Sequence, residues 1–135
     1  MNVLIMTDQE GVAGYVSFDH DQGSRNNEQG KHLLTGEVNA AVDGLLEAGA
    51  KDILVLDGHG AGAVHYPDLH DAARLLHGRP LGPRSEWDKV MPRYDVTMII
   101  GQHAMAGVQT GNLHHTQSSQ SIDYYKLNKR PIGEI

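Results

Sequence analysis

Apolar residues fall into three short runs and one long periodic segment along this chain. The short runs at residues 2–6, 52–56 and 96–100 are each closed by polar residues, which predicts buried strands. Residues 28–48 carry apolar side chains at a 3-4-3-4 spacing, which predicts a helix with one face on the sheet. Strands that alternate with helices favour an α/β fold: three layers, with helices on both faces of a mostly parallel sheet.

The other segments are predicted from their polar, glycine and proline content. Ser24 or Asn26 can cap the start of the long helix, and Gly49 is a natural stop. We predict a loop at 18–27, a short helix at about 68–76, mostly loop at 78–93, irregular structure at 104–120 and a C-terminal hairpin at 122–132.

A single domain accounts for residues 1–135, because the chain can form one core and has no repeat or linker. It stops after Gly133-Glu134-Ile135, where another element would be expected. We therefore predict that the chain is the N-terminal part of a longer protein with a larger fold.

The amino-acid composition limits which metal ligands and which partners are possible. The absence of cysteine excludes disulfides and thiolate metal sites and suits a reducing cytoplasm. A net charge of −6 argues against a general nucleic-acid partner, and no apolar run is long enough to span a membrane. Nine histidines remain beside the carboxylates, a ligand set suited to zinc, manganese or cobalt.

Metal-capable residues follow each predicted strand. Asp8 and Glu10 come after the first strand, Asp57 and His59 after the second, and His103 after the third. The carboxyl ends of parallel strands meet at one edge of a sheet, so these side chains can converge there. In Asp8-Gln9-Glu10, one carboxylate could bridge two metals while the other completes the shell of the first.

Some of these residues have a second interpretation. His59 could be a ligand or part of a plain turn, and Asp57 could orient a ligand or form the turn. The glycines at 58–62 do not have dinucleotide-loop spacing, and the lack of a G-x-S-x-G motif excludes a serine esterase.

His114 and His115 are adjacent and point in different directions, so we expect one of them to reach a site. Five other histidines do not follow a strand and are assigned to loops or helix surfaces: His20, His32, His65, His70 and His77.

Seven short motifs follow one another along nearly the whole chain: Asp8-x-Glu10-Gly11, Arg25-Asn26-x-Glu28-x-Gly30, Leu34-Thr35-x-Glu37-x-Asn39-Ala40-Ala41, Asp57-x-His59-Gly60, Gly101-x-His103-Ala104-x-Ala106-Gly107, His115, and Asn128-x-Arg130-Pro131-x-Gly133-Glu134. Together they resemble the DppA-type D-aminopeptidases, zinc peptidases associated with dipeptide-transport operons. Two positions depart from the pattern: Gln102 stands where the family has an aromatic residue, and Asn27 where it has a tyrosine.

The resemblance implies two zinc ions per subunit at the carboxyl edge of the sheet, and a ring-shaped homo-oligomer, of which a decamer is one possible size. Family members are roughly twice as long as this chain. The catalytic histidine would be His115, with His114 as the alternative. The implied metal ligands are Asp8 (bridging), Glu10, His59, His103 and Glu134.

The expected function is that of a zinc-dependent aminopeptidase. It would use a metal-activated water to hydrolyse short peptides with an N-terminal D-residue, such as D-Ala-D-Ala. Two alternatives remain open. One is another dinuclear hydrolase, such as a phosphoesterase. The other is a non-catalytic, metal-containing binding protein of a peptide-transport system.

Overall fold

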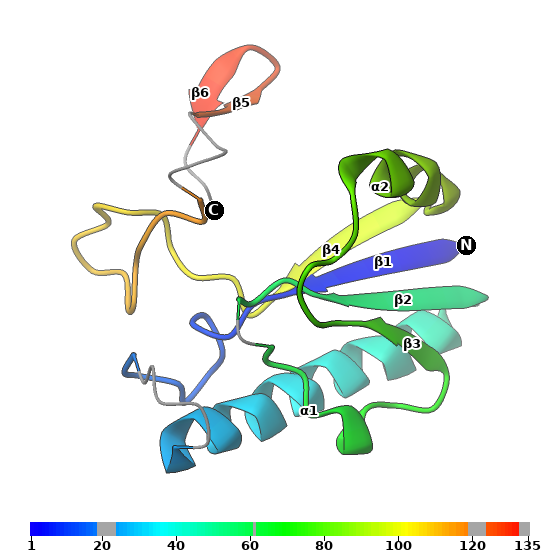
Figure 1. Cartoon of the computed structure of the whole chain (residues 1–135), viewed down its shortest axis with the longest axis horizontal. Coiled ribbons are helices and arrows are strands. Elements are labelled where there is room, and N and C mark those ends of the chain that lie inside the picture. Colours follow the sequence, from blue (N-terminus) through cyan, green and yellow to red (C-terminus); the bar gives the residue numbers. More distant parts are fainter. Residues whose placement is uncertain (19–23, 61, 119–123, 133–135) are drawn as a thin grey trace.

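The computed structural model describes residues 1–18, 24–60, 62–118 and 124–132 (Figure 1). A four-stranded parallel sheet has the order β3-β2-β1-β4. Its strands are β1 (Asn2–Thr7), β2 (Asp52–Asp57), β3 (Ala73–Leu76) and β4 (Val96–Ile100). A separate antiparallel hairpin consists of β5 (Tyr125–Leu127) and β6 (Arg130–Ile132), which confirms the predicted C-terminal hairpin.

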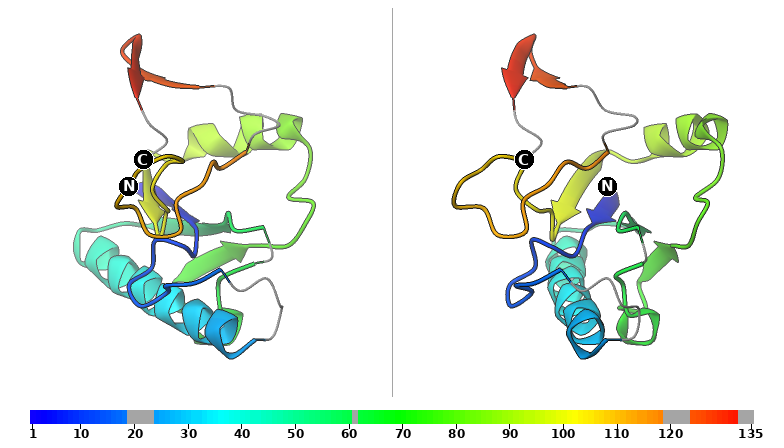
Figure 2. Two further views of the ribbon diagram at one scale, coloured as in Figure 1. Left: turned by 90° about the vertical axis from the view of Figure 1, so that its left-hand side faces the viewer. Right: turned by 60° about the vertical axis from the view of Figure 1, so that its left-hand side comes forward.

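Helix α1 (Arg25–Glu47) covers one face of the sheet (Figures 1 and 2). Ser24 caps its start, because the side chain accepts a hydrogen bond from the amide of Asn27. Gly49 follows its end with a φ of +82°, where glycine is favoured. The helix was predicted correctly, although it begins three residues before the predicted start at 28. The larger part of the core lies between α1 and the sheet and includes Val3, Ile5, Leu34, Val38, Val42, Ile53 and Val55.

The opposite face is covered by α2 (Arg84–Val90), which continues into a 3-10 turn, η2 (Met91–Arg93). Trp87 and Val90 pack against a second buried cluster formed by Leu4, Leu54 and Leu56. The prediction of mostly loop at 78–93 was wrong over this stretch, since the indole of Trp87 helps cover the apolar face that β1 and β2 expose. Helices therefore lie on both faces of the sheet, as predicted.

The predicted short helix at 68–76 was also wrong. The chain forms a 3-10 turn, η1 (Tyr66–Asp68), and then the edge strand β3, which pairs in parallel with β2. Leu75 packs on the core under α1 and Leu76 on the cluster under α2, which is the alternation of a strand. Pairing and burial on both faces outweigh the helical preference of Ala-Arg-Leu-Leu.

All four strands run in one direction, so their carboxyl ends lie at one edge of the sheet, opposite the N-terminus (Figure 1). Segment 101–118 extends beyond this edge and is irregular, as predicted. Within the described ranges, no helix is long and apolar enough to cross a membrane.

Candidate metal centre

The turn after β1 is held against the end of β4 by backbone hydrogen bonds. The amide of Asp8 donates to the carbonyl oxygen of Ile100 at 3.0 Å, and that of Gly11 donates to Gly101 at 2.8 Å. A Cβ atom on Gly11 would lie 2.1 Å from the carbonyl oxygen of Gln102, so only glycine fits there. This close contact fixes the position of Asp8 at the carboxyl edge of the sheet.

Asp57, the last residue of β2, forms the turn that follows it. Its buried carboxylate accepts hydrogen bonds from the amides of Ala63, at 2.8 Å, and Val64, at 3.0 Å. Of the two roles open for Asp57, the geometry selects that of a buried turn former.

His59 follows Asp57 on a turn that is fixed from both sides. The amide of Gly58 donates to the carbonyl oxygen of Thr7 at 3.0 Å. The guanidinium of Arg79 donates to the carbonyl oxygens of Gly58, at 2.7 Å, and His59, at 3.1 Å. Arg79 is a supporting residue that sequence reasoning did not identify, because it lies 20 residues from the turn that it holds.

His103 lies three residues beyond β4 and is only 2% exposed. Its Nδ1 atom is 2.8 Å from the carbonyl oxygen of Ala104. A carbonyl oxygen only accepts hydrogen bonds, so Nδ1 donates here and Nε2 is the nitrogen that is left for a metal ion. That Nε2 atom lies 3.5 Å from Oδ2 of Asp8. The imidazole is thus oriented with this nitrogen towards the carboxylate of Asp8.

Four of the predicted ligands converge. Nδ1 of His59 lies 3.1 Å from Oδ1 of Asp8 and 3.2 Å from Oε2 of Glu10, and these three groups offer ligand atoms within 4.8 Å of one another. Zinc bonds of about 2.0–2.2 Å place tetrahedral ligand atoms roughly 3.3–3.6 Å apart, so the side chains need to open only slightly to admit an ion. The two oxygens of Asp8 face different histidines, His59 and His103.

Glu10 supplies the clearest sign that a cation fits here. Its Oε2 atom is buried and makes no hydrogen bond within the described part of the chain, although His59 is close. An unsatisfied buried carboxylate oxygen is costly. A metal ion among Asp8, Glu10 and His59 would satisfy it, and carboxylate and imidazole donors suit zinc.

The protonation of the metal-free site reflects the same concentration of negative charge. Burial disfavours the imidazolium of His59, but the carboxylates of Asp8 and Glu10 outweigh it and raise the pKa of His59 to about 9. Burial likewise disfavours the charged form of Glu10, but interactions with His59 and Asp8 lower its pKa to about 2. At neutral pH a proton on His59 thus compensates the charge that a cation would otherwise balance.

A cavity of about 460 Å³ opens onto these residues. It lies at the carboxyl edge of the sheet and is bounded by the strand-end turns, segment 101–118 and the hairpin. Its lining residues are Met6, Thr7, Asp8, Glu10, Gly58, His59, Gly60, Gln102, His103, His115, Gln117, Ser118 and Tyr125.

Comparisons with known proteins identify the family of this chain. The model of the D-aminopeptidase family, peptidase family M55, matches residues 1–135. The chain belongs to the D-aminopeptidase family. A D-aminopeptidase of Bacillus subtilis (strain 168) is 27% identical over 137 residues, which cover 100% of this chain and 49% of that protein. The chain therefore spans about half the length of this relative.

A solved structure of a relative has a similar fold. It is described as the Zn-dependent D-aminopeptidase DppA from Bacillus subtilis, a self-compartmentalizing protease. The TM-score is 0.78 at 27% identity, and the match covers 99% of this chain and 48% of that chain. The predicted α/β architecture is confirmed, and it corresponds to about half of the chain of that relative.

In this member of the D-aminopeptidase family, His115 and not His114 lines the cavity. The rings of His115 and His103 stack with their centroids 3.6 Å apart. Nδ1 of His115 lies 2.8 Å from the carbonyl oxygen of Leu113, which can only accept, so Nδ1 is the donor in this hydrogen bond. His114 instead accepts a hydrogen bond from the amide of Gly107.

A chain of hydrogen bonds leads from the hairpin to the metal centre. Gln102 donates to Oδ2 of Asp8 at 3.1 Å, Gln117 donates to Gln102 at 2.8 Å, and the hydroxyl of Tyr125 donates to Gln117. Gln102 is one of the two positions that depart from the family pattern. The sequence signalled a difference there but not the contact with Asp8.

Glu134, the remaining predicted ligand, lies outside the described residues. The hairpin that precedes it ends at Ile132.

Proposed function

We propose that this chain carries the two-metal centre of a zinc-dependent aminopeptidase that hydrolyses short peptides with an N-terminal D-residue. The observation that carries the proposal is the convergence of Asp8, Glu10, His59 and His103 on one cavity. The family membership of the chain supports the reaction class.

The contacts support the proposed ligand roles. Glu10 and His59 would hold one ion with Oδ1 of Asp8, and His103 would hold a second with Oδ2 of Asp8, so that Asp8 bridges. Glu134 stays a proposed ligand through its place in the sequence motif. A zinc pair supplies an acidified water as nucleophile and stabilises negative charge on the peptide oxygen.

His115 is the proposed catalytic residue. His115 lines the cavity, and its Nδ1 atom donates to the carbonyl oxygen of Leu113, which leaves Nε2 for the substrate. A protonated Nε2 can stabilise the developing oxyanion or donate a proton to the leaving amine. Stacking on His103 orients the ring for either role.

The cavity chemistry favours a peptide amine over a phosphate. The described lining residues include the carboxylates of Asp8 and Glu10 but no lysine or arginine. A free N-terminal ammonium is attracted to these carboxylates, whereas a phosphate monoester would be repelled and would lack the cationic groups that usually bind it. The preference for a D-residue is carried over from the name of the relatives.

We further infer a cytoplasmic location and self-association into a ring-shaped homo-oligomer. The cysteine-free composition supports the location. The solved relative is described as self-compartmentalizing, which supports the assembly. A decamer is one size consistent with such a ring.

Metal analysis and a peptidase assay test the function together. Purified protein should contain about two zinc ions per subunit, and a chelator should abolish release of D-alanine from D-Ala-D-Ala until zinc is restored. L-Ala-L-Ala is the stereochemical control, and p-nitrophenyl phosphate tests the phosphoesterase alternative. Full activity in the metal-free protein, or faster phosphate than peptide hydrolysis, would refute the proposal.

A further inference from the structure

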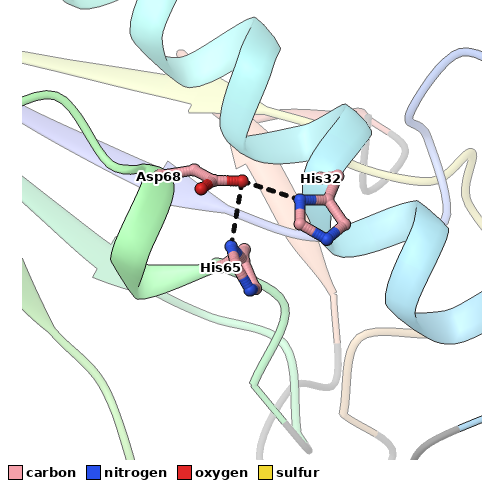
Figure 3. A group of neighbouring side chains, drawn as sticks. All are labelled: His32, His65 and Asp68. Carbon is pink, nitrogen blue, oxygen red and sulfur yellow. Dashed lines mark hydrogen bonds and ion pairs between the residues drawn. The ribbon is translucent and has the colours of Figure 1, made fainter.

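A second group of metal-binding side chains lies outside the centre described above. Nδ1 of His32 is 2.7 Å, and Nδ1 of His65 is 3.0 Å, from the same oxygen of Asp68, Oδ2 (Figure 3). The three groups offer ligand atoms within 4.8 Å of one another. All three side chains point towards one another, His32 from α1 and the other two from the connection between β2 and β3. The group shares no residue with the candidate metal centre.

The backbone around this group is fixed to α1 by two side chains on the same helix face. Thr35 accepts a hydrogen bond from the amide of His65 at 2.9 Å. Asn39 donates to the carbonyl oxygen of Asp68 at 2.7 Å and accepts from the amide of His70 at 2.8 Å. Positions 32, 35 and 39 recur at helical spacing, so one face of α1 supplies both a ligand and the supports for the other two.

We propose that His32, His65 and Asp68 form a second metal-binding site, for Zn²⁺ or a divalent transition ion of similar ligand preference. Two imidazoles and a carboxylate are the donors such ions prefer, and three protein ligands leave positions for water. His32 and Asp68 are about half exposed, at 52% and 51%, so an ion can reach them from solvent. A bound ion would tie α1 to the β2–β3 connection.

Two further observations favour an ion over a plain hydrogen-bonded triad. Nδ1 of His65 is buried and makes no hydrogen bond within the described residues, despite its short distance to Asp68. The rings of His32 and His65 lie with centroids 4.1 Å apart, so both imidazoles are close enough to share one ion.

Zinc titration of the metal-stripped chain tests the site. Calorimetry with Zn²⁺ alone should find one more bound ion per chain in the unaltered protein than in His32→Gln. The amide NMR signals of residues 64–70 should shift in that step. His32→Gln and, separately, His65→Gln should each weaken the affinity for this additional ion about tenfold or more. Even residues that only support a metal ligand have effects of that size. His77→Gln, which removes an exposed histidine outside the group, should leave this affinity unchanged.

The proposal would be overturned if the unaltered protein and His32→Gln bound the same number of zinc ions. An equal loss of the step in His77→Gln would also overturn it. Because His32 is exposed, its variant should keep the fold, which circular dichroism checks, and His65→Gln provides a second test. The outcome is independent of peptidase activity, since Asp8, Glu10, His59 and His103 are unaltered in all of these variants.

Discussion

His59 lies between two carboxylates, and a proton and a cation compete for it. In the metal-free protein its pKa is raised to about 9, above the ordinary value of 6.5, so the contribution of this proton to stability is fully present below pH 6.5 and is lost as pH rises through 9. The pKa of Glu10 is lowered from 4.5 to about 2, so its contribution is present above pH 4.5 and is lost as pH falls through 2.

These two shifts predict the pH dependence of the metal-free protein. The free energy of unfolding contributed by this site should be largest between pH 4.5 and 6.5 and should decline towards pH 9. Urea denaturation in the presence of a chelator measures it. His59→Gln should abolish much of the alkaline decline, because glutamine has no proton to lose there. An identical alkaline decline in the variant would show that other groups cause it.

His115 gives the residue-scale prediction for activity, which rests on the proposed function. His115→Ala should keep its zinc but lose about 10²–10⁴-fold in kcat, the usual contribution of a positioned acid or base. His114→Ala is the matched control, because His114 lies outside the lining of the cavity, and it should stay close to the unaltered rate. Peptide hydrolysis and zinc content are measured on each variant. Unchanged turnover in His115→Ala would reassign the role.

The sequence indicates candidate metal ligands better than it indicates the residues that hold them in place. Asp8, Glu10, His59 and His103 follow apolar runs, and strand-end placement brings them together without any knowledge of loop geometry. Supports such as Arg79 depend on where a distant loop folds back, which no local pattern encodes. The contact of His32 with His65 and Asp68 likewise depends on packing between elements.

At the scale of elements, the strand-end turns are set by backbone contacts. Gly11→Ala would place a Cβ atom 2.1 Å from the carbonyl oxygen of Gln102, against a backbone that cannot move away easily. We expect a loss of about 1–3 kcal/mol in the free energy of unfolding, as in other overpacked sites. Zinc affinity should also fall, because Asp8 lies on the same turn.

Gly36→Ala is the matched control for this prediction. Gly36 lies exposed within α1, and an added Cβ would meet no atom within 4 Å. Alanine should therefore stabilise the protein by about 0.5–1 kcal/mol through helix propensity. Thermal and urea denaturation of both variants measure the two effects, and a Gly11→Ala protein as stable as the unaltered chain would contradict the role given to that contact.

Elements with a strong hydrophobic periodicity of their own were predicted. The short elements β3 and α2, which depend on packing against other elements of the chain, were not. The long helix and the strands at 2–7, 52–57 and 96–100 carry their own hydrophobic pattern. β3 has four residues and is a strand because β2 offers it an edge. α2 is similarly short, and the apolar face under it supplies much of its stability.

At the scale of the whole molecule, β4 is one of the two outer strands of the sheet. β4 pairs with β1 on one side only among the described residues, and Val96 and Ile99 are 40% and 44% exposed. Exposed apolar residues on an open edge strand favour pairing with another chain. The chain spans about half the length of its relative.

This edge predicts concentration-dependent self-association of the 135-residue chain. Ile99→Lys should reduce it, because a charge on an edge strand opposes both pairing and apolar contact. Light scattering coupled to size-exclusion chromatography, over a range of concentrations, measures the mass. Ile132→Lys places the same charge on the hairpin, where Ile132 is 49% exposed, and should leave the association unchanged. If both variants dissociate the chain equally, general surface charge and not the β4 edge controls assembly.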